Sequence, residues 1–214
     1  MKVQKFTVVI LVVLGVLLIA GLIAPKFLGS TTGADKKQLA ELGFYRFDSP
    51  RNIAPVVLKD LKGEKVTLIG RHEQWQLVNF GYMFCPDICP VNLRFISDIK
   101  KAWDAENSQN PFAITHITFD PERDTADRLE KYLDYHNTSY DGLTGDLENI
   151  RKVAQQLNTV FIHEKPDEYG NYFITHSDSI ALINPKGQYV GMFKGPYDNY
   201  NIDSVVEVLS SVIN

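Results

Sequence analysis

Cysteine is scarce in this 214-residue chain, which contains only two. Two thiols are too few for the disulfide framework of a small secreted scaffold, and they cannot supply a four-thiolate zinc site. They can form one disulfide or provide two ligands to a metal ion. Hydrophobic residues make up 44% of the chain and charged residues 22%, which is the composition of a globular protein. The length suits one domain with an appendage.

An excess of basic residues is also lacking. The 22 Lys and Arg residues are outnumbered by 26 Asp and Glu residues, which gives a formal net charge of −4. Such a chain has no broad basic surface for phosphate groups, so no nucleic-acid partner is expected. Internal repeats and low-complexity tracts are missing after the N-terminal segment, which argues against a repeat architecture.

The N-terminal segment contains no charge from Phe6 to Ala24, a run of 19 residues. About 20 apolar residues cross a bilayer as a helix, and Lys2 and Lys5 before the run keep the N-terminus in the cytoplasm. We therefore predict that residues 1–26 form an uncleaved membrane anchor. A cleaved signal peptide is the alternative, although its apolar region is usually only about 7–15 residues long. No cysteine lies near this segment to carry a lipid.

Export of the remaining chain follows from this orientation. Residues 27–214 hold 19 basic and 26 acidic side chains, a formal charge of −7. The simplest location is the bacterial cytoplasmic (inner) membrane, crossed once, with the C-terminal domain on the outer, periplasmic face. Both cysteines then lie in an oxidising compartment, where they can form a disulfide.

The rest of the sequence predicts a tether at residues 27–49 and one folded domain at residues 50–214. Hydrophobic periodicity and turn residues predict strands at 56–58, 66–68, 77–82, 113–119, 179–183 and 189–193, and helices up to about 106, at 125–136, at 147–157 and at 204–213. Strands that alternate with helices imply a central sheet covered on both faces. We predict an α/β fold of the thioredoxin-like type, with a central mixed sheet, helices on both faces and additional β-hairpins.

The two cysteines lie in the segment Cys85-Pro86-Asp87-Ile88-Cys89-Pro90, between a predicted buried strand and a predicted helix. Open α/β sheets bind ligands at this carboxyl edge. A helix begins here, either with Pro90 in its first position or with a first turn from Pro86, and its N-terminus lowers the pKa of nearby thiols. With three intervening residues, one helical turn brings the sulfurs close enough to chelate a metal ion or to close a disulfide. Thiolates select copper(I) or zinc, and two of them need a third ligand.

Five histidines could supply that third ligand. His176 stands in Ile174-Thr175-His176-Ser177, where the chain enters a predicted late hairpin strand that lies beside the cysteines in a thioredoxin-like sheet. It is the preferred candidate. Three of the others have ordinary structural explanations: a polar surface stretch for His72, a core or edge position in a strand for His116 and a helix end for His136. His163 lies just before a charged loop and is a plausible ligand that no feature of the sequence requires.

Three separate segments resemble the SCO/SenC family of membrane-anchored copper proteins. They are Gly81-Tyr82-Met83-Phe84-Cys85-Pro86-Asp87-Ile88-Cys89-Pro90, Thr118-Phe119-Asp120-Pro121-Glu122-Arg123-Asp124-Thr125, and Thr175-His176-Ser177 followed by Ile183-Asn184-Pro185-Lys186-Gly187. The resemblance covers residues 50–213 and includes the anchor. It implies a thioredoxin-like domain that binds one copper ion through Cys85, Cys89 and His176. Two thiolates and a neutral imidazole suit copper(I), and an added ligand could hold copper(II).

The resemblance further implies delivery of copper to the copper A centre of cytochrome c oxidase subunit II, or maintenance of that centre's cysteines. Other extracytoplasmic copper chaperones or thiol reductants are the remaining expected partners. Because the chemistry is transfer of a bound ion, no enzyme activity is expected. One alternative is an extracytoplasmic thiol–disulfide oxidoreductase that uses Cys85 and Cys89 as a redox pair. Another is a copper- or redox-sensing module.

Three further residues have candidate roles near the site. Asp87, between the cysteines, could shape a partner contact or compensate the helix N-terminus. Asp120, at a strand end, could support the ligands or cap the next turn. Met83 stands where the family often has a small polar residue, so it could change the metal environment or simply fill a gap in the packing.

Overall fold

The computed structural model describes residues 36–69, 73–106, 112–136, 140–197 and 200–213. Within these ranges, no helix is long and apolar enough to cross a membrane. The predicted anchor at residues 1–26 and the histidine at position 72 lie outside the described residues.

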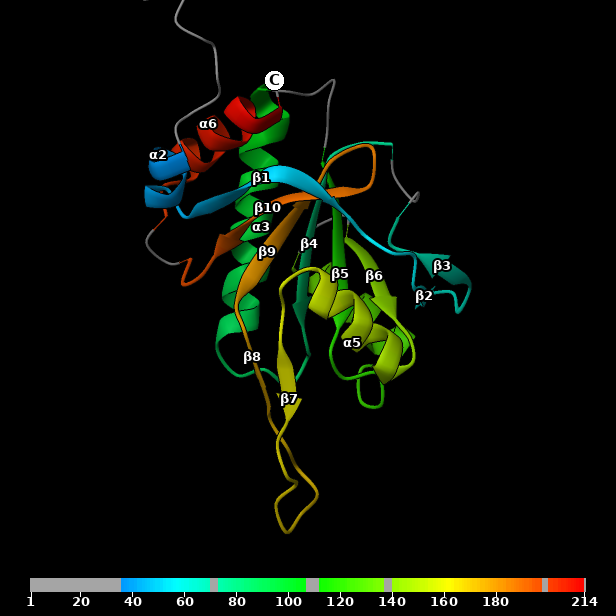
Figure 1. Ribbon diagram of the computed structural model, residues 1–214. Coiled ribbons are helices and arrows are strands. Elements are labelled where there is room, and N and C mark those ends of the chain that lie inside the picture. Colours follow the sequence, from blue (N-terminus) through cyan, green and yellow to red (C-terminus); the bar gives the residue numbers. More distant parts are fainter. Residues whose placement is uncertain (1–35, 70–72, 107–111, 137–139, 198–199, 214) are drawn as a thin grey trace, which may run out of the picture. The chain divides into compact units, whose positions relative to one another are not determined.

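An eight-stranded sheet forms the centre of the domain, in the order β1-β10-β9-β4-β5-β6-β2-β3 (Figure 1). Its strands are β1 (Phe44–Asn52), β2 (Val57–Asp60), β3 (Lys65–Thr67), β4 (Gln76–Gly81), β5 (Ala113–Thr118), β6 (Tyr140–Thr144), β9 (Ser179–Ile183) and β10 (Gln188–Lys194). Strands β4, β5 and β6 are parallel, whereas β9 runs antiparallel to β4, and β10 to β9. The sheet is therefore mixed. Two short strands, β7 (Phe161–His163) and β8 (Ile174–His176), form a separate antiparallel pair.

Helices cover both faces of the sheet, as Figure 1 shows for α5 on one side and α3 on the other. The described helices are α2 (Lys36–Glu41), α3 (Ile88–Glu106), α4 (Ala126–Tyr135), α5 (Leu147–Gln156) and α6 (Ile202–Ile213). Leu77 of β4 belongs to the apolar cluster formed with α3 and α6, and its neighbour Val78 belongs to the cluster formed with α5. Because β4 is buried on both faces, its sequence is a nearly continuous apolar run. The predicted thioredoxin-like arrangement is confirmed.

The domain begins earlier than the predicted boundary at residue 50. Helix α2 and strand β1 lie in the segment that we expected to be a tether, with Leu39 and Phe44 fully buried and β1 paired with β10. The tether prediction is wrong for residues 36–49 for a physical reason. Strand β1 is an edge strand with one partner, so most of its side chains face solvent and it tolerates Pro50, which breaks the apolar alternation that marks a strand.

The other predicted elements lie close to the observed ones. Strands β6, β7 and β8 were not predicted, because each is short or strongly polar. His176 was expected to enter the late hairpin strand, but it ends the separate strand β8. Leu147, the first residue of α5, is 37% exposed. The turn between β9 and β10 is held by Asn184, whose Oδ1 accepts hydrogen bonds from the backbone N–H groups of Lys186 and Gln188.

Candidate metal centre

The cysteine segment links the end of β4 to the start of α3. The backbone N–H of Cys85 donates to the carbonyl of Tyr82 (3.2 Å), which closes a turn, and the N–H of Cys89 donates to the sulfur of Cys85 (3.4 Å). Helix α3 begins at Ile88, so neither predicted start is correct: Cys89 is its second residue and Pro90 its third. Both cysteines are free thiols, and Cys89 is 1% exposed. Each sulfur therefore lies at a helix N-terminus, whose dipole favours a thiolate.

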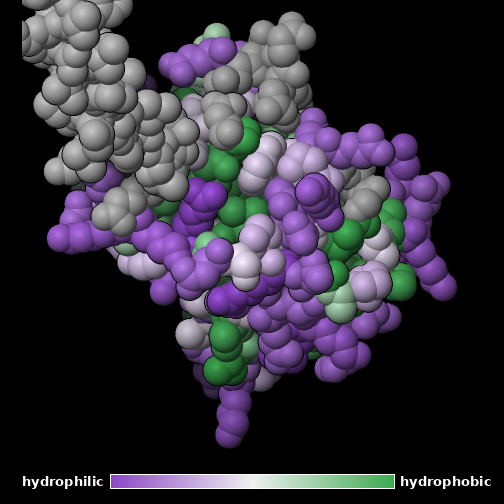
Figure 2. Space-filling view, turned by 45° about the horizontal axis from the view of Figure 1, so that its top comes forward, coloured by the Kyte–Doolittle hydropathy of each residue, from purple (hydrophilic) through white to green (hydrophobic). Residues whose placement is uncertain are grey.

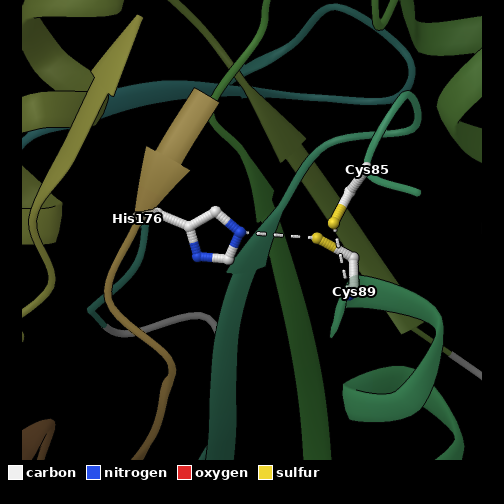
Figure 3. Close-up of side chains that lie close together, drawn as sticks. All are labelled: Cys85, Cys89 and His176. Carbon is white, nitrogen blue, oxygen red and sulfur yellow. Dashed lines mark hydrogen bonds between the residues drawn. The ribbon is translucent and has the colours of Figure 1, made fainter. Parts of the chain in front are cut away.

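His176, at the end of strand β8, points toward the two cysteines (Figure 3). Its Nδ1 lies 3.0 Å from the carbonyl oxygen of Ser177, to which it donates a hydrogen bond, so in the neutral imidazole Nε2 carries the lone pair that can bind a metal ion. Nε2 lies 3.6 Å from Cys89 Sγ. The imidazole also packs against the rings of Tyr82 and Phe119, at centroid distances of 6.2 and 5.0 Å. These contacts hold the ring with Nε2 directed at the sulfur.

Three ligand atoms thus converge, because those of Cys85, Cys89 and His176 all lie within 4.8 Å of one another. Among the described residues, no other group of His, Cys, Asp or Glu was found with this proximity. His136 caps the C-terminus of α4, as predicted, and His163 belongs to β7 beside the ring of Tyr172. Two soft thiolates and one imidazole are the donor set that copper(I) and zinc prefer.

The two cysteines share one proton, and this sharing lowers the pKa of Cys85 to about 4. The hydrogen bond from the Cys89 thiol is the largest cause, burial opposes it, and a hydrogen bond from His176 assists it. The same hydrogen bond, together with burial, raises the pKa of Cys89. Burial opposes a charge on His176, but hydrogen bonds to Cys85 and to the Ser177 carbonyl outweigh it and raise the pKa of the imidazole. The metal-free site therefore holds one thiolate ready for a cation.

Alkylation of Cys85 by iodoacetamide should accordingly depend little on pH. An ordinary thiol, with a pKa near 8.5, loses about tenfold in rate for each pH unit below that value. With a pKa of about 4, Cys85 remains a thiolate from pH 8 down to pH 6 and is protonated only as the pH falls through 4. Mass spectrometry of the modified peptide measures the rate. In Cys89→Ala the hydrogen bond from residue 89 is lost and the pH dependence should return, whereas a tenfold fall per pH unit in the unchanged protein would contradict the assignment.

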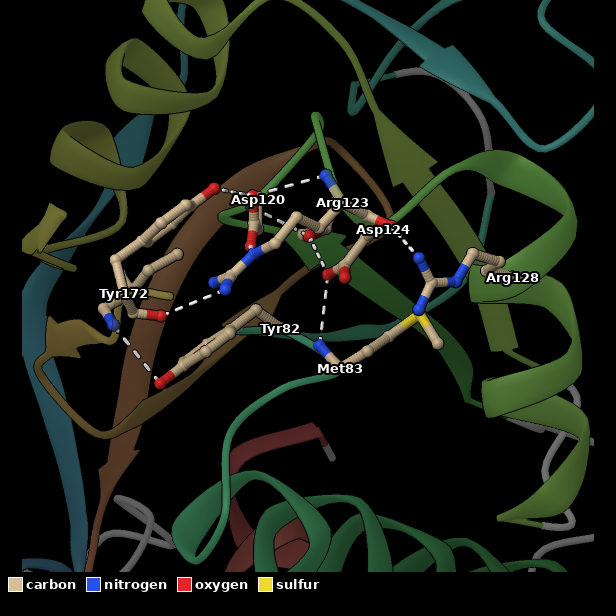
Figure 4. A network of polar contacts seen from close by, with 9 residues as sticks. Tyr82, Met83, Asp120, Arg123, Asp124, Arg128 and Tyr172 are labelled. Carbon is tan, nitrogen blue, oxygen red and sulfur yellow. Dashed lines mark hydrogen bonds and ion pairs between the residues drawn. The ribbon is translucent and has the colours of Figure 1, made fainter. Parts of the chain in front are cut away.

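A polar network supports the cysteine segment from behind (Figure 4). Asp124 accepts hydrogen bonds from the hydroxyl of Thr118 (2.6 Å) and from the backbone N–H of Met83 (3.1 Å), which ties the loop after β5 to the residue two positions before Cys85. Asp120 accepts a hydrogen bond from the hydroxyl of Tyr172 (2.8 Å) and forms an ion pair with Arg123. Asp120 thus braces the loop against the segment that leads to His176.

The structure also places the three further residues that the sequence suggested near the site, Asp87, Asp120 and Met83. Asp87 is exposed, and Asp120 bonds within the supporting network. Met83 contributes its backbone N–H to that network. Asp124 and Tyr82, whose hydroxyl accepts from the backbone N–H of Ile174 (3.2 Å), were not predicted. For Asp124, the available signal was a carboxylate in a loop that directly follows a buried strand.

Gly81, the last residue of β4, has no side chain, and this lets Cys89 lie close to the sheet. A Cβ at this position would lie 3.1 Å from Cys89 Sγ and 3.0 Å from Cε1 of His116, both tighter than ordinary contacts. His116 is fully buried, so of the two predicted positions, core or edge of the sheet, the core position is correct. Neither of its ring nitrogens has a hydrogen-bond partner among the described residues. Burial, with a smaller contribution from His136, lowers the pKa of His116 to about 3.

Replacing His116 with phenylalanine should make the protein more resistant to acid. Between pH 6.5 and 3 the unfolded chain binds a proton at this position that the native state excludes. The free energy of unfolding therefore falls by about 1.4 kcal/mol for each unit by which the pH is lowered in this range. The stability advantage of His116→Phe over the unchanged protein should therefore grow by about 2 kcal/mol between pH 7 and pH 5. Urea unfolding at both pH values measures this difference. An advantage that stays constant would show that His116 is protonated in the native state.

The fold and the site together define a class: a thioredoxin-like domain with two thiols at a helix start and an imidazole facing them. Comparison with known proteins narrows this class. The SCO1/SenC family model matches residues 48–214. The chain is 32% identical over 148 residues to a Stutzerimonas stutzeri protein named for copper binding, covering 69% of each. It is 33% identical over 120 residues to the mitochondrial SCO2 homolog of Bos taurus, covering 56% of this chain and 45% of that protein, so the match spans about half of the relative.

Solved structures agree with the sequence matches. The copper-bound crystal structure of Arabidopsis thaliana ScoI superposes with a TM-score of 0.65 at 29% identity, and the match covers 75% of this chain and 96% of that one. The chain belongs to the SCO1/SenC family.

Proposed function

We propose that this protein binds one copper ion through Cys85, Cys89 and His176 and delivers it to another protein. The observation that carries the proposal is the placement of two sulfurs and one imidazole nitrogen within 4.8 Å of one another. The donor chemistry fits the ion, since thiolates and imidazole are ligands of copper(I), and an added ligand would accommodate copper(II). Copper is here the cargo. Three ligands at the edge of a sheet leave room for an incoming thiolate of a partner to replace them one at a time.

The acceptor that we propose is the copper A centre of cytochrome c oxidase subunit II. Support comes from the family resemblance and from copper-bound relatives such as Arabidopsis thaliana ScoI. The apolar run from Phe6 to Ala24 supports a single-pass anchor in the bacterial inner membrane with the domain on the periplasmic face, beside the exposed domain of a membrane-bound oxidase. Extracytoplasmic copper chaperones or thiol reductants would load or reduce the site. In this role the protein is a carrier and has no enzyme activity.

Copper transfer to a purified apo copper A domain tests the proposal. The reduced full chain should bind one copper(I) per molecule and pass it to the apo domain, which then develops the absorption of a copper A centre. The His176→Ala protein should load weakly and transfer little. A full chain that loads one copper ion and keeps it in the presence of excess apo domain would refute delivery while leaving the binding site intact.

A second candidate function is reduction of a disulfide in the partner's copper site. It is favoured by the low pKa of Cys85, because a thiolate with a neighbouring thiol can attack a disulfide and then be released by Cys89. Such a reaction does not need His176 as a ligand. Metal-free protein that reduces an oxidised copper A peptide equally well with and without His176 would support this role over metal delivery.

A further inference from the structure

The strand pair β7–β8 has two faces with different surroundings. In the register Phe161↔His176, Ile162↔Thr175 and His163↔Ile174, alternate residues point to opposite sides. Phe161 and Ile174 are buried in the domain core, on the face that carries His176. Ile162 and Thr175 are exposed on the other face. One short ribbon therefore presents its metal ligand inward and a second surface outward.

The outward face of the ribbon is apolar and uncovered. Val160, Ile162 and Phe173 are 62%, 61% and 57% exposed, and together they are called the hairpin patch below. Backbone hydrogen bonds of Val160 with Ser177 and of Phe173 with Glu164 continue the ribbon beyond its assigned strands, which keeps the three side chains on one side. Figure 1 shows the hairpin projecting from the body of the domain. Figure 2 shows hydrophobic surface on this projection. A projecting apolar face is costly in water unless something binds it.

The hairpin patch belongs to the same short ribbon as one of the metal ligands, although it lies on the opposite face. Its strand β8 ends at His176. Phe84, which directly precedes Cys85, is 44% exposed and adds a second apolar side chain next to the ligands. The guanidinium of Arg123 lies 4.8 Å from the centre of the Phe84 ring, so this side chain is held in place.

An acidic cleft adjoins the hairpin patch. It has a volume of about 490 Å³ and is lined by residues of the loop after β5, the start of α5 and the hairpin, among them Asp120, Glu122, Asp146 and Glu164. Asp120 is neutralised by Arg123. In the part of the chain that the structure describes, no ion pair is found for the other three carboxylates. Glu164 lines the cleft and lies two residues after Ile162 on the same face of the ribbon, so the cleft meets the hairpin patch at this residue.

We propose that the hairpin patch is the docking surface for the copper-accepting protein, and that a Lys or Arg of that protein enters the acidic cleft. This inference rests on the proposed delivery function. The geometry favours a protein partner with an apolar patch and a basic rim: apolar burial supplies binding free energy, and the carboxylates select the charge. A lipid surface fits less well, because the carboxylates beside the patch, for which the described residues supply no ion pair, are repelled by anionic headgroups.

The test compares copper transfer from two variants of the full chain in detergent. Ile162→Thr/Phe173→Thr removes most of the patch while retaining strand-forming residues, and Tyr135→Thr removes an 84% exposed aromatic side chain of α4 as the matched control. We expect the double variant to bind copper(I) with unchanged affinity and to transfer it on the order of tenfold more slowly or worse, since anchors of an interface each carry a tenfold effect or more. The control should transfer at the unchanged rate. Glu122→Gln/Glu164→Gln should also slow transfer and reduce its dependence on salt.

Several outcomes would overturn the docking proposal. Equal transfer rates for the double variant and the control would show that the patch does not bind the acceptor. A slower rate only when the chain is held in phosphatidylcholine nanodiscs would assign the patch to lipid. Dimers of the unchanged chain that the double variant fails to form would assign it to a second copy. Failure of the unchanged chain to transfer any copper would instead refute the delivery function, and the docking proposal with it.

Discussion

Serine in place of Cys89 is expected to abolish tight copper(I) binding. A serine hydroxyl at neutral pH is neutral, hard and protonated, so the site would retain one thiolate and one imidazole. Loss of a residue that merely orients a ligand typically costs 10–100-fold in metal affinity, and loss of a ligand itself should cost more than about 100-fold. Competition against a chromogenic copper(I) chelator measures the affinity. Cys85→Ser should behave in the same way.

Two histidine variants complete this comparison. His176→Ala should weaken binding strongly, because Nε2 is the third atom of the converging group. His163→Ala is the matched control, since His163 lies in the partner strand β7 and outside that group, and it should bind copper as the unchanged protein does. Full-strength binding by the His176 variant would refute the three-ligand site.

Alanine in place of Phe119 is expected to weaken both the fold and the metal centre. Phe119 is fully buried and packs its ring against Phe80, Phe161 and the His176 imidazole, at centroid distances of 5.4, 4.4 and 5.0 Å. Removing a buried aromatic ring costs about 3–5 kcal/mol of unfolding free energy. The cavity would also free the imidazole to turn, so we expect copper affinity to fall by about 10–100-fold. Urea unfolding and chelator competition measure the two effects separately.

Trp103→Ala provides the control for general loss of stability. Trp103 is also buried, but it lies near the C-terminal end of α3, in the cluster on the other face of the sheet. Its removal should cost a similar 3–5 kcal/mol while copper affinity stays within about twofold, provided that the protein is folded under the assay conditions. If both variants lost copper affinity equally, the effect would come from destabilisation and not from the position of His176.

Much of the fold could be predicted from local sequence patterns. Strand β4 and helix α5 were placed to within one residue at each end, because an apolar run and a period of 3.6 are local signals. Strand β1 was missed because its stability comes from pairing with β10, more than 130 residues later in the chain. An edge strand with exposed, polar side chains carries no strong local pattern.

The candidate site divides in the same way. The spacing of Cys85 and Cys89 at a helix start is local, so the sequence alone determined that two thiols would lie together and that one could ionise easily. The choice of His176 among five histidines, by contrast, needed topology or family resemblance. Only the tertiary structure brings its imidazole to 3.6 Å from Cys89 Sγ, 87 positions away in the chain, by pairing β8 with β7 instead of with the main sheet.

The surroundings of the ligands were decided by the tertiary structure alone. Asp124 supports the cysteine segment through the Met83 N–H, and Gly81 leaves room for Cys89, through contacts that no spacing in the sequence reports. The outward apolar face of the hairpin is a further case, because β7 and β8 are three residues each and their faces are set by register. Composition and hydrophobic periodicity indicate which secondary structure each segment can form. Which segments meet depends on long-range packing, in which the free energy of burial outweighs weak local preferences.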